Sequence, residues 1–237
     1  MENKIDLFLK QLNLQIKNKE LIKHSLTHRS YRGKNNERLE FLGDAVIEML
    51  SSIYLYNRFP NEKEGILTKY RSALVKTSTL AKVAKNINLG DFIILSKGEE
   101  DNGGRQRENI LGDAFEALVG AIYIDTGIEY TNKFLYTHLY CILDGIISNK
   151  EYLNYKSSLQ EAIQSKYKVI PRYQVIKEEG PSHNRIFTVS MSINKKKISV
   201  GTGKSKQEAE ENAAKNAILE IKKKHDKNKI NKTGEET

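Results

Sequence analysis

The stretch NNERLEFLGDAVIEML, residues 35–50, decides how the N-terminal part of the chain folds. Its apolar residues recur at the three- and four-residue intervals of a helix with one buried face. The same stretch carries the acids Glu37, Glu40, Asp44 and Glu48. At about 100° per residue, the first three project within roughly 60° of one another, where like charges repel. A bound cation is the simplest way to make that arrangement tolerable.

A second apolar stretch, NILGDAFEALVGAIY at residues 109–123, carries Asp113 and Glu116 three positions apart. Acids within an apolar run are costly to bury unless they pair with cations or bind a metal. Two such helices face to face would offer the oxygen ligands that Mg²⁺ prefers, and would favour metal-assisted hydrolysis. The alternative is a set of exposed acids paired with arginines. The candidate arginines are Arg38, Arg71 and Arg107.

The rest of the chain predicts two domains. Residues 1–147 alternate amphipathic helical runs with glycine and proline breakers, which predicts an all-helical domain. A polar linker is expected over 148–152. Residues 153–222 read as a helix, three strands and a helix, which is a small α+β domain. The final residues, 223–237, are rich in lysine and almost free of apolar side chains, so a disordered basic tail is expected.

The charge distribution separates the two domains. The chain has a net charge of +9, yet residues 1–151 carry 21 Lys and Arg against 20 Asp and Glu. Residues 152–221 carry 12 against 7, and residues 222–237 carry 6 against 3. The positive excess therefore lies in the last third of the chain, which favours a polyanionic partner there. A merely basic, soluble surface is the alternative.

Several classes of protein are excluded by what the sequence lacks. It has no apolar run long enough to span a membrane and no secretory signal at its start, so no membrane partner is expected. Cys141 is the only cysteine, and a reducing, cytoplasmic location is the simplest interpretation. GTGKS, residues 201–205, lacks the first glycine of a phosphate-binding loop, so no nucleotide cofactor is expected.

Three segments resemble the signature of the ribonuclease III family. They are HRSYRGKNNERLEFLGDAVIEML at residues 28–50, PNEKEGILTKYRSALVKTSTLA at residues 60–81 and GGRQRENILGDAFEALVGAIYID at residues 103–125. The resemblance implies an endonuclease domain that forms a homodimer and cleaves double-stranded RNA with Mg²⁺, for which Mn²⁺ can substitute. It further implies products with 5′-phosphate and 3′-hydroxyl ends, and precursor ribosomal RNA and other structured transcripts as substrates.

The resemblance also implies roles for individual residues. Glu40, Asp44, Asp113 and Glu116 fall on the family's metal ligands, and Asp44 and Glu116 are expected to be catalytic. Glu37 and Glu64 match auxiliary acids, although each can equally be an ordinary surface acid. Phe41 matches an apolar knob at the subunit interface, with ordinary core packing as the alternative.

Residues 153–222 resemble the double-stranded-RNA-binding domain through YKSSLQEAIQ, GPSHNRIF and GTGKSKQEAEENAAKNAI. Such a domain reads the shape, 2′-hydroxyls and phosphates of A-form RNA. Ser205 can also be a helix N-cap that pairs with Glu208, His183 can be a turn residue, and Gln207 stands where many such domains have a lysine. The implied RNA contacts are Gln160 and Glu161, then Pro181, Ser182 and His183, then Lys204, Ser205 and Lys206.

Two functions from different classes are therefore carried forward. The first is an endoribonuclease specific for double-stranded RNA. The second is a regulator that binds double-stranded RNA without cutting it. The acids favour the enzyme, because negative charge without a metal would repel the phosphates of a bound RNA.

Overall fold

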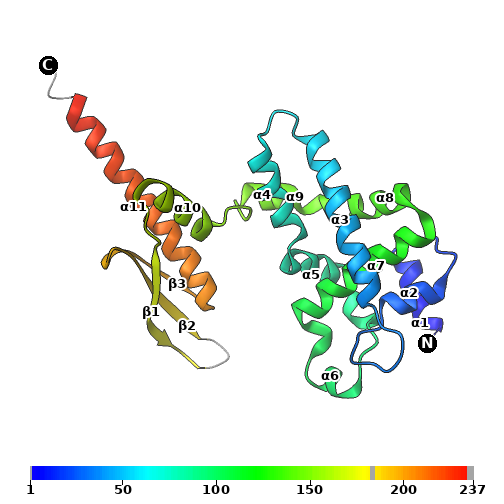
Figure 1. The fold of residues 1–237 in the computed structure, drawn as a ribbon. Helices are drawn as coiled ribbons and strands as arrows, with labels where there is room; N and C mark the ends of the chain where they lie inside the picture. The colour runs from blue at the N-terminus through cyan, green and yellow to red at the C-terminus, as the bar shows by residue number, and fades with distance from the viewer. Residues whose placement is uncertain (1, 182–184, 234–237) are drawn as a thin grey trace. The chain divides into compact units, whose positions relative to one another are not determined.

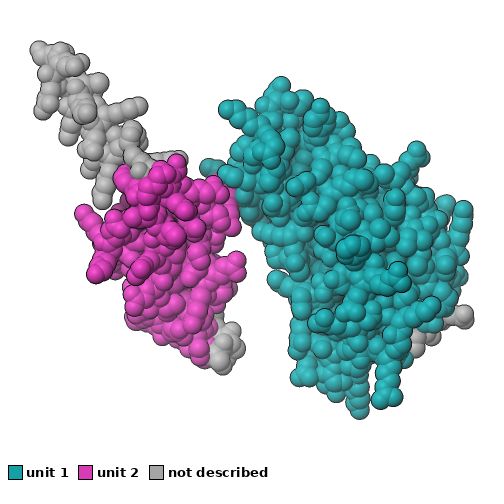
Figure 2. All heavy atoms as spheres, viewed as in Figure 1, with its two compact units in different colours: residues 1–152 teal, residues 153–237 magenta. Residues whose placement is uncertain are grey.

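The computed structural model describes residues 2–181 and 185–233. Contacts along the chain divide it into two compact units, residues 1–152 and residues 153–237, which Figure 2 shows in different colours. The start of the second unit coincides with the predicted start of the second domain. Of the helices in the described residues, none is both long and apolar enough to cross a membrane.

The first unit is helical, as predicted (Figure 1). Three short 3₁₀ segments connect its helices: η1 (Leu89–Phe92), η2 (Gly104–Gln106) and η3 (Tyr140–Ile142). The α-helices are α1 (Glu2–Gln11), α2 (Lys19–Ser25), α3 (Glu37–Arg58), α4 (Glu64–Val75), α5 (Thr77–Asn86), α6 (Lys97–Asp101), α7 (Glu108–Thr126), α8 (Ile128–His138) and α9 (Leu143–Ser148).

Helix α7 forms the centre of the first unit. Most of its side chains are buried, including Phe115, Leu118 and Ile122, because the apolar residues of this stretch surround the whole helix. Helix α3 packs along it through one face, on which Leu39, Val46 and other apolar side chains are buried. The apolar character of these two stretches thus places the two acid-bearing helices beside each other.

A short loop before α3 is held by backbone pairing with a segment distant in sequence. Thr27 forms an isolated parallel bridge with Ile94, and the His28 N–H donates to the carbonyl of Ile94 at 3.0 Å. The Asn36 N–H donates back to the carbonyl of Thr27 at 2.8 Å, which closes the loop at the start of α3. Residues 28–35 are therefore fixed at both ends.

The second unit has the predicted order of helix, three strands and helix (Figure 1). Its antiparallel sheet has the strand order β1-β2-β3. On β2, Val189 and Met191 are fully buried, because alternate residues of a strand point to the same face. The elements are α10 (Tyr155–Tyr167), β1 (Arg172–Glu179), β2 (Ile186–Ile193), β3 (Lys196–Gly203) and α11 (Lys206–Thr233).

Helix α11 lies across the sheet through small side chains. Ala209, Ala213, Ala214 and Ala217 are fully buried. Ile221, which lies one turn after Ala217, is 41% exposed. A Cβ at Gly201 would lie 2.1 Å from the Ala213 backbone nitrogen, so β3 and α11 approach too closely there for any side chain.

The structure adds detail at two predicted boundaries. In the segment 148–152, which we expect to be a linker, Tyr152 lies edge-on against Tyr70 of α4 with ring centroids 4.8 Å apart. The predicted disordered tail is helical to Thr233, because α11 continues through it. A helix that is already nucleated extends readily through lysine-rich sequence that contains no proline and, before residue 234, no glycine.

Candidate metal centre and nucleic-acid interface

Three carboxylates from α3 and α7 converge. One oxygen from each of Glu40, Asp113 and Glu116 lies within 4.8 Å of the others, and all three side chains are half-buried. Glu40 comes from the first turn of α3, whereas Asp113 and Glu116 stand one helical turn apart on α7. The two stretches of sequence that combined acids with apolar periodicity thus meet at one place, as predicted.

Two glycines allow α3 and α7 to approach this closely. A Cβ at Gly43 would lie 1.8 Å from the backbone carbonyl oxygen of Glu116, and one at Gly120 would lie 2.3 Å from that of Leu39. Any side chain at either position would push the helices apart. Gly43 lies between Glu40 and Asp44 in sequence, so the point of closest approach is also the point where the acids meet.

The cluster lacks sufficient counter-charge. Burial, together with the charges of Asp44, Asp113 and Glu40, raises the pKa of Glu116 to about 8. Burial also raises the pKa of Glu40, and Asp113 and Glu37 add to that rise. The pKa of Asp113 is raised by burial as well. Each carboxyl therefore holds its proton more tightly than an isolated acid would.

The alternative in which the acids pair with arginines is wrong for this cluster. Arg71 pairs with Glu48 at 3.0 Å, and Arg107 pairs with Glu99 at 2.6 Å. Arg38 makes no ion pair with any described residue, and neither do Glu40, Asp44, Asp113 and Glu116.

The chemistry of this donor set fits a hard divalent cation. All the donors are carboxylate oxygens, which Mg²⁺ and Mn²⁺ accept, and the set contains no sulfur or imidazole. A cation placed among them would oppose the effect of burial and of the neighbouring acids on these pKa values. Such a cation would be held by Glu40, Asp113 and Glu116.

Asp44 stands outside the group of three oxygens. It lies one turn beyond Glu40 on α3 and its side chain is exposed, although its charge still acts on Glu116. Glu37 lies at the start of α3, where Arg29 approaches it at 3.7 Å and the Asn35 side-chain amide donates to it at 2.9 Å. Of the four acids predicted to bind metal, three thus lie together and Asp44 lies beside them. Glu37, predicted as an auxiliary acid, lies at the start of the same helix.

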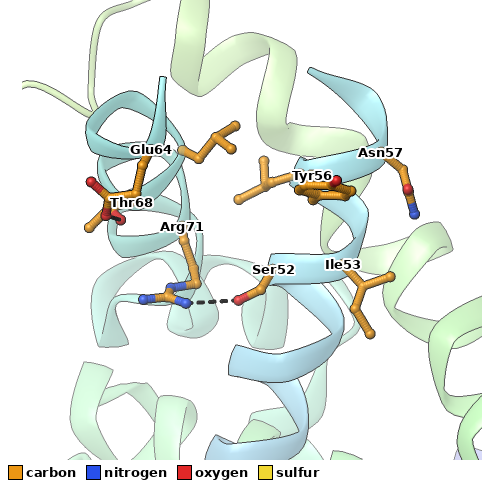
Figure 3. A pocket seen from close by; sticks show the side chains of 9 residues that line it. Ser52, Ile53, Tyr56, Asn57, Glu64, Thr68 and Arg71 are labelled. Carbon is orange, nitrogen blue, oxygen red and sulfur yellow. Dashed lines mark hydrogen bonds between the residues drawn. The ribbon is translucent and has the colours of Figure 1, made fainter. Parts of the chain in front are cut away.

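Glu64 is not near the cluster within one chain. It is the first residue of α4 and lines a cavity of about 490 Å³ between α4 and the C-terminal half of α3 (Figure 3). Thr68 donates a hydrogen bond to it at 2.8 Å. The cause is the path of the chain, since α4 packs against residues such as Ser52 and Tyr56 of α3 and not against the turn that carries Glu40.

The structure adds two basic residues that the sequence pattern did not single out as part of the site. Arg29 and His28 both oppose the rise in the pKa of Asp113 that burial causes. Both belong to a loop, and loop residues have no periodicity that predicts which way they face. The available signal was their place in HRS, residues 28–30, in the loop that precedes the acid-bearing helix.

Most of the predicted RNA contacts of the second unit are exposed. Gln160 and Glu161 lie on the outer face of α10, and Pro181 follows β1. Ser182 and His183 lie outside the described residues. Lys204, Ser205 and Lys206 are exposed around the start of α11.

The start of α11 is a capped helix terminus. The Glu208 N–H donates to Ser205 Oγ at 3.1 Å, and the carboxylate of Glu208 accepts from the Lys204 N–H at 2.7 Å. Ser205 is therefore the N-cap, as predicted. In the usual capping box, the glutamate would accept from the N–H of Ser205, whereas here it accepts from the N–H of Lys204, one residue earlier. Lys206 lies 3.5 Å from Glu178 and over the ring of Phe187, so its ammonium group is held at the end of the helix.

Two family models match the chain in the regions of the two units. One is described as Ribonuclease-III-like and matches residues 18–142. The other is described as the double-stranded RNA binding motif and matches residues 155–221.

Similar proteins cover nearly the whole chain. A Ribonuclease 3 from Clostridium botulinum is 42% identical over 221 residues, which are 91% of this chain and 95% of the relative. A Ribonuclease 3 from Borreliella burgdorferi is 41% identical over 223 residues, covering 92% of this chain and 91% of the relative.

Solved structures match the first unit. A crystal structure of the nuclease domain of ribonuclease III from Campylobacter jejuni is 44% identical, with a TM-score of 0.56, and covers 59% of this chain and 95% of that one. A second structure of that domain concerns flexibility in its region involved in dimer formation. It has a TM-score of 0.54 at 44% identity and covers 56% of this chain and 93% of that one.

Proposed function

The chain belongs to the ribonuclease III family, and on that premise we propose that it is an endoribonuclease that hydrolyses double-stranded RNA. The observation that carries the proposal is the meeting of Glu40, Asp113 and Glu116 on two helices, in a chain that also has a double-stranded RNA binding motif. A protein that only bound RNA would have no use for half-buried acids that repel phosphates.

Each acid has a distinct task in this proposal. Glu40, Asp113 and Glu116 would hold Mg²⁺, or Mn²⁺ in its place, and Asp44 lies close enough to act on Glu116. Such a cation would supply Lewis-acid polarisation of the phosphodiester and of a water molecule. Asp44 and Glu116 are the acids to which we assign the catalytic role. In the metal-free protein, burial and the charges of Asp44, Asp113 and Glu40 raise the pKa of Glu116 to about 8, and a bound cation would lower it.

The second unit would bring the duplex to this centre. The exposed residues Gln160 and Glu161 on α10 suit contacts to 2′-hydroxyls in a minor groove. Lys204, Ser205 and Lys206 lie at the N-terminus of α11, where free N–H groups and positive potential favour phosphates. We place Pro181, Ser182 and His183 in the next minor groove.

We further propose that the active form is a homodimer. Phe41 is 81% exposed, which excludes the alternative of ordinary core packing within one chain. Met49, Ile53 and Tyr56 are also exposed on α3, and their spacing from Phe41 keeps all four within about a third of the helix circumference. The cavity of Figure 3 opens beside Ile53 and Tyr56. An apolar face of this kind suits a second copy of the chain.

A two-fold dimer matches the chemistry, because a duplex has two antiparallel strands and each centre cuts one strand. Glu64 lies away from the cluster of its own chain and would join a centre as an auxiliary acid only across such a dimer. Glu37 would act at the rim of the centre in its own chain.

The proposal includes the substrates and products. We expect cleavage to leave 5′-phosphate and 3′-hydroxyl ends, and we expect precursor ribosomal RNA and other structured transcripts as substrates in the cytoplasm. The rival function is a regulator that binds the same RNA without cutting it. The acidic cluster and the family relationship both favour the enzyme.

Incubation of end-labelled duplex RNA with the full-length protein tests the proposal. With Mg²⁺, the wild type should cut the duplex and leave a single strand of the same sequence intact. Glu116→Gln should bind the duplex with unchanged affinity and not cut it. Glu108→Gln, which removes an exposed acid from the start of the same helix, is the matched control and should cut as the wild type does. A wild type that binds the duplex without cutting it would establish the regulator instead.

A further inference from the structure

Among the described residues, Arg29 is the cation with the largest electrostatic effect on Asp113 and Glu40 of the acidic cluster. Its guanidinium Nη1 lies 3.7 Å from an oxygen of Glu37, and its side chain is 69% exposed. Burial raises the pKa of Asp113, and Arg29 is the strongest charge opposing that rise. For Glu40, burial, Asp113 and Glu37 raise the pKa, and Arg29 is the one cation that opposes them. Arg29 therefore acts on both helices of the centre.

The loop that carries Arg29 is held on both sides of it. The backbone of His28 is bonded to Ile94 at 3.0 Å, and Ser30 Oγ accepts from the Ser96 N–H at 3.1 Å. His28 Nδ1 in turn accepts from the Ser30 N–H at 3.1 Å. Because both neighbours are fixed to the segment 94–96, the position from which the Arg29 side chain extends is fixed as well.

Glu37 gives the guanidinium a direction. Its other carboxylate oxygen accepts from the Asn35 side-chain amide at 2.9 Å, and its own N–H donates to the Asn35 side-chain oxygen at 3.2 Å. Glu37 is thus oriented by Asn35 and in turn meets Arg29. An exposed arginine is not normally restricted in this way, since surface pairs of long side chains contribute little to stability.

We infer that Arg29 is a substrate-binding residue of the nuclease centre. It binds the RNA phosphate backbone at the rim of the Glu40–Asp113–Glu116 cluster, and Glu37 is the positioning residue that orients it. This inference rests on the proposed function. A guanidinium is planar, remains charged at all relevant pH values and binds phosphate oxygens in pairs, so it suits this role better than any other side chain.

The electrostatics explain why the centre needs such a residue. The centre gathers five acids, and those that are ionised repel an approaching phosphate. They are Glu37, Glu40, Asp44, Asp113 and Glu116. Arg29 faces Glu37, Glu40 and Asp113 from the loop side, together with His28, on which Glu99 also acts. A permanent positive charge at this point would guide the backbone to the centre and fix its register there.

The test measures cleavage of a labelled duplex by the full-length protein at saturating Mg²⁺. Arg29→Ala should lower kcat/KM by about tenfold or more, as expected for the loss of a charge-assisted hydrogen bond in the transition state. Arg29→Lys should recover only part of that loss, because an ammonium group cannot bind two oxygens in the plane of a fork. Binding of the duplex without metal should change by less than about threefold, since the second unit supplies most of that affinity.

A Glu37 variant distinguishes loss of the Arg29–Glu37 pair from a general loss of charge. Glu37→Gln should lower kcat/KM less than Arg29→Ala does, and the double variant should be no worse than Arg29→Ala alone, because the glutamate acts through the arginine. If the two losses instead multiply, the two residues act independently and the assignment of Glu37 as the residue that holds Arg29 is overturned.

Arg32→Ala is the matched control, since Arg32 is an exposed arginine of the same loop and makes no ion pair with any described residue. It should cost less than about threefold. An equal loss of kcat/KM in Arg29→Ala and Arg32→Ala would mean that the loop attracts RNA only through its overall positive charge, and would overturn the inference. Wild-type cleavage by Arg29→Ala would also overturn it, and the proposed function would stand as long as Glu116→Gln is inactive. If Arg29→Ala does not fold by circular dichroism, Arg29→Gln replaces it under the same criteria.

Discussion

Glu116 makes the metal-free protein sensitive to pH at the scale of one side chain. Burial, with Asp44, Asp113 and Glu40, raises its pKa from an ordinary 4.5 to about 8. Between these values the folded protein keeps a proton that the unfolded chain releases, so raising the pH favours unfolding. In EDTA, Tm should fall as the pH rises from about 5 to about 8. Glu116→Gln should flatten this fall, as measured by circular dichroism, and parallel curves for the two proteins would contradict the assignment.

A divalent cation should reverse that dependence. Metal binding requires the carboxylates of Glu40, Asp113 and Glu116 without their protons, so binding must release protons wherever their pKa values are raised. Calorimetry of Mg²⁺ binding in two buffers of different ionisation enthalpy should show net proton release at about pH 7, and the rise in Tm on adding Mg²⁺ should be larger at about pH 8 than at about pH 6. Binding without proton release would indicate that the cation is held elsewhere.

At the scale of the helix, Gly43 controls whether the centre exists at all. A methyl group there would lie 1.8 Å from the Glu116 carbonyl oxygen, so Gly43→Ala must separate α3 from α7. The expected result is a loss of stability of about 2 kcal/mol or more in urea unfolding, together with loss of cleavage.

Gly145→Ala is the control for that variant. Gly145 lies within α9, and a Cβ built on it meets no atom within 4 Å. Because alanine favours a helix over glycine, this variant should be as stable as the wild type or more stable by up to about 1 kcal/mol, and should keep full cleavage. If Gly43→Ala behaved like Gly145→Ala, close helix contact would not be what assembles the centre.

At the scale of the whole molecule, Phe41 tests the dimer. Since its side chain is 81% exposed, Phe41→Ser should leave the fold of one chain intact but weaken association. Light scattering after size-exclusion chromatography should show a dimer for the wild type and a shift toward monomer for the variant. Leu7→Ala, a change at a 58% exposed residue of α1, should leave the dimer unchanged. A wild type that is monomeric at micromolar concentration would remove this part of the proposal.

Periodicity explains how far the sequence alone predicted the molecule. The acids of α3 and α7 were found because they interrupt helical apolar patterns, and the strands of the second unit were found from the alternation along β2. Asp44 was expected in the cluster because one helix face contains it. Its charge acts on Glu116, but its side chain is exposed and lies outside the group of three oxygens.

Other features depended on contacts between distant segments. The site of Glu64 follows from how α4 packs, and the place of Arg29 follows from hydrogen bonds between its loop and residues 94–96. Neither arrangement produces a periodic pattern in the sequence from which it could be predicted. The helical extension of α11 was not predicted, because the amino-acid composition of residues 223–237 contains no information about the helix that precedes them.

The central claim is that carboxylates of α3 and α7 jointly hold a divalent cation, and Mn²⁺ titration followed by electron paramagnetic resonance tests it most directly. The signal of free Mn²⁺ should fall on addition of the wild type and of Glu108→Gln, and Glu40→Gln, Asp113→Asn and Glu116→Gln should each abolish that fall. Binding of Mn²⁺ by all three variants as tightly as by the wild type would contradict the account.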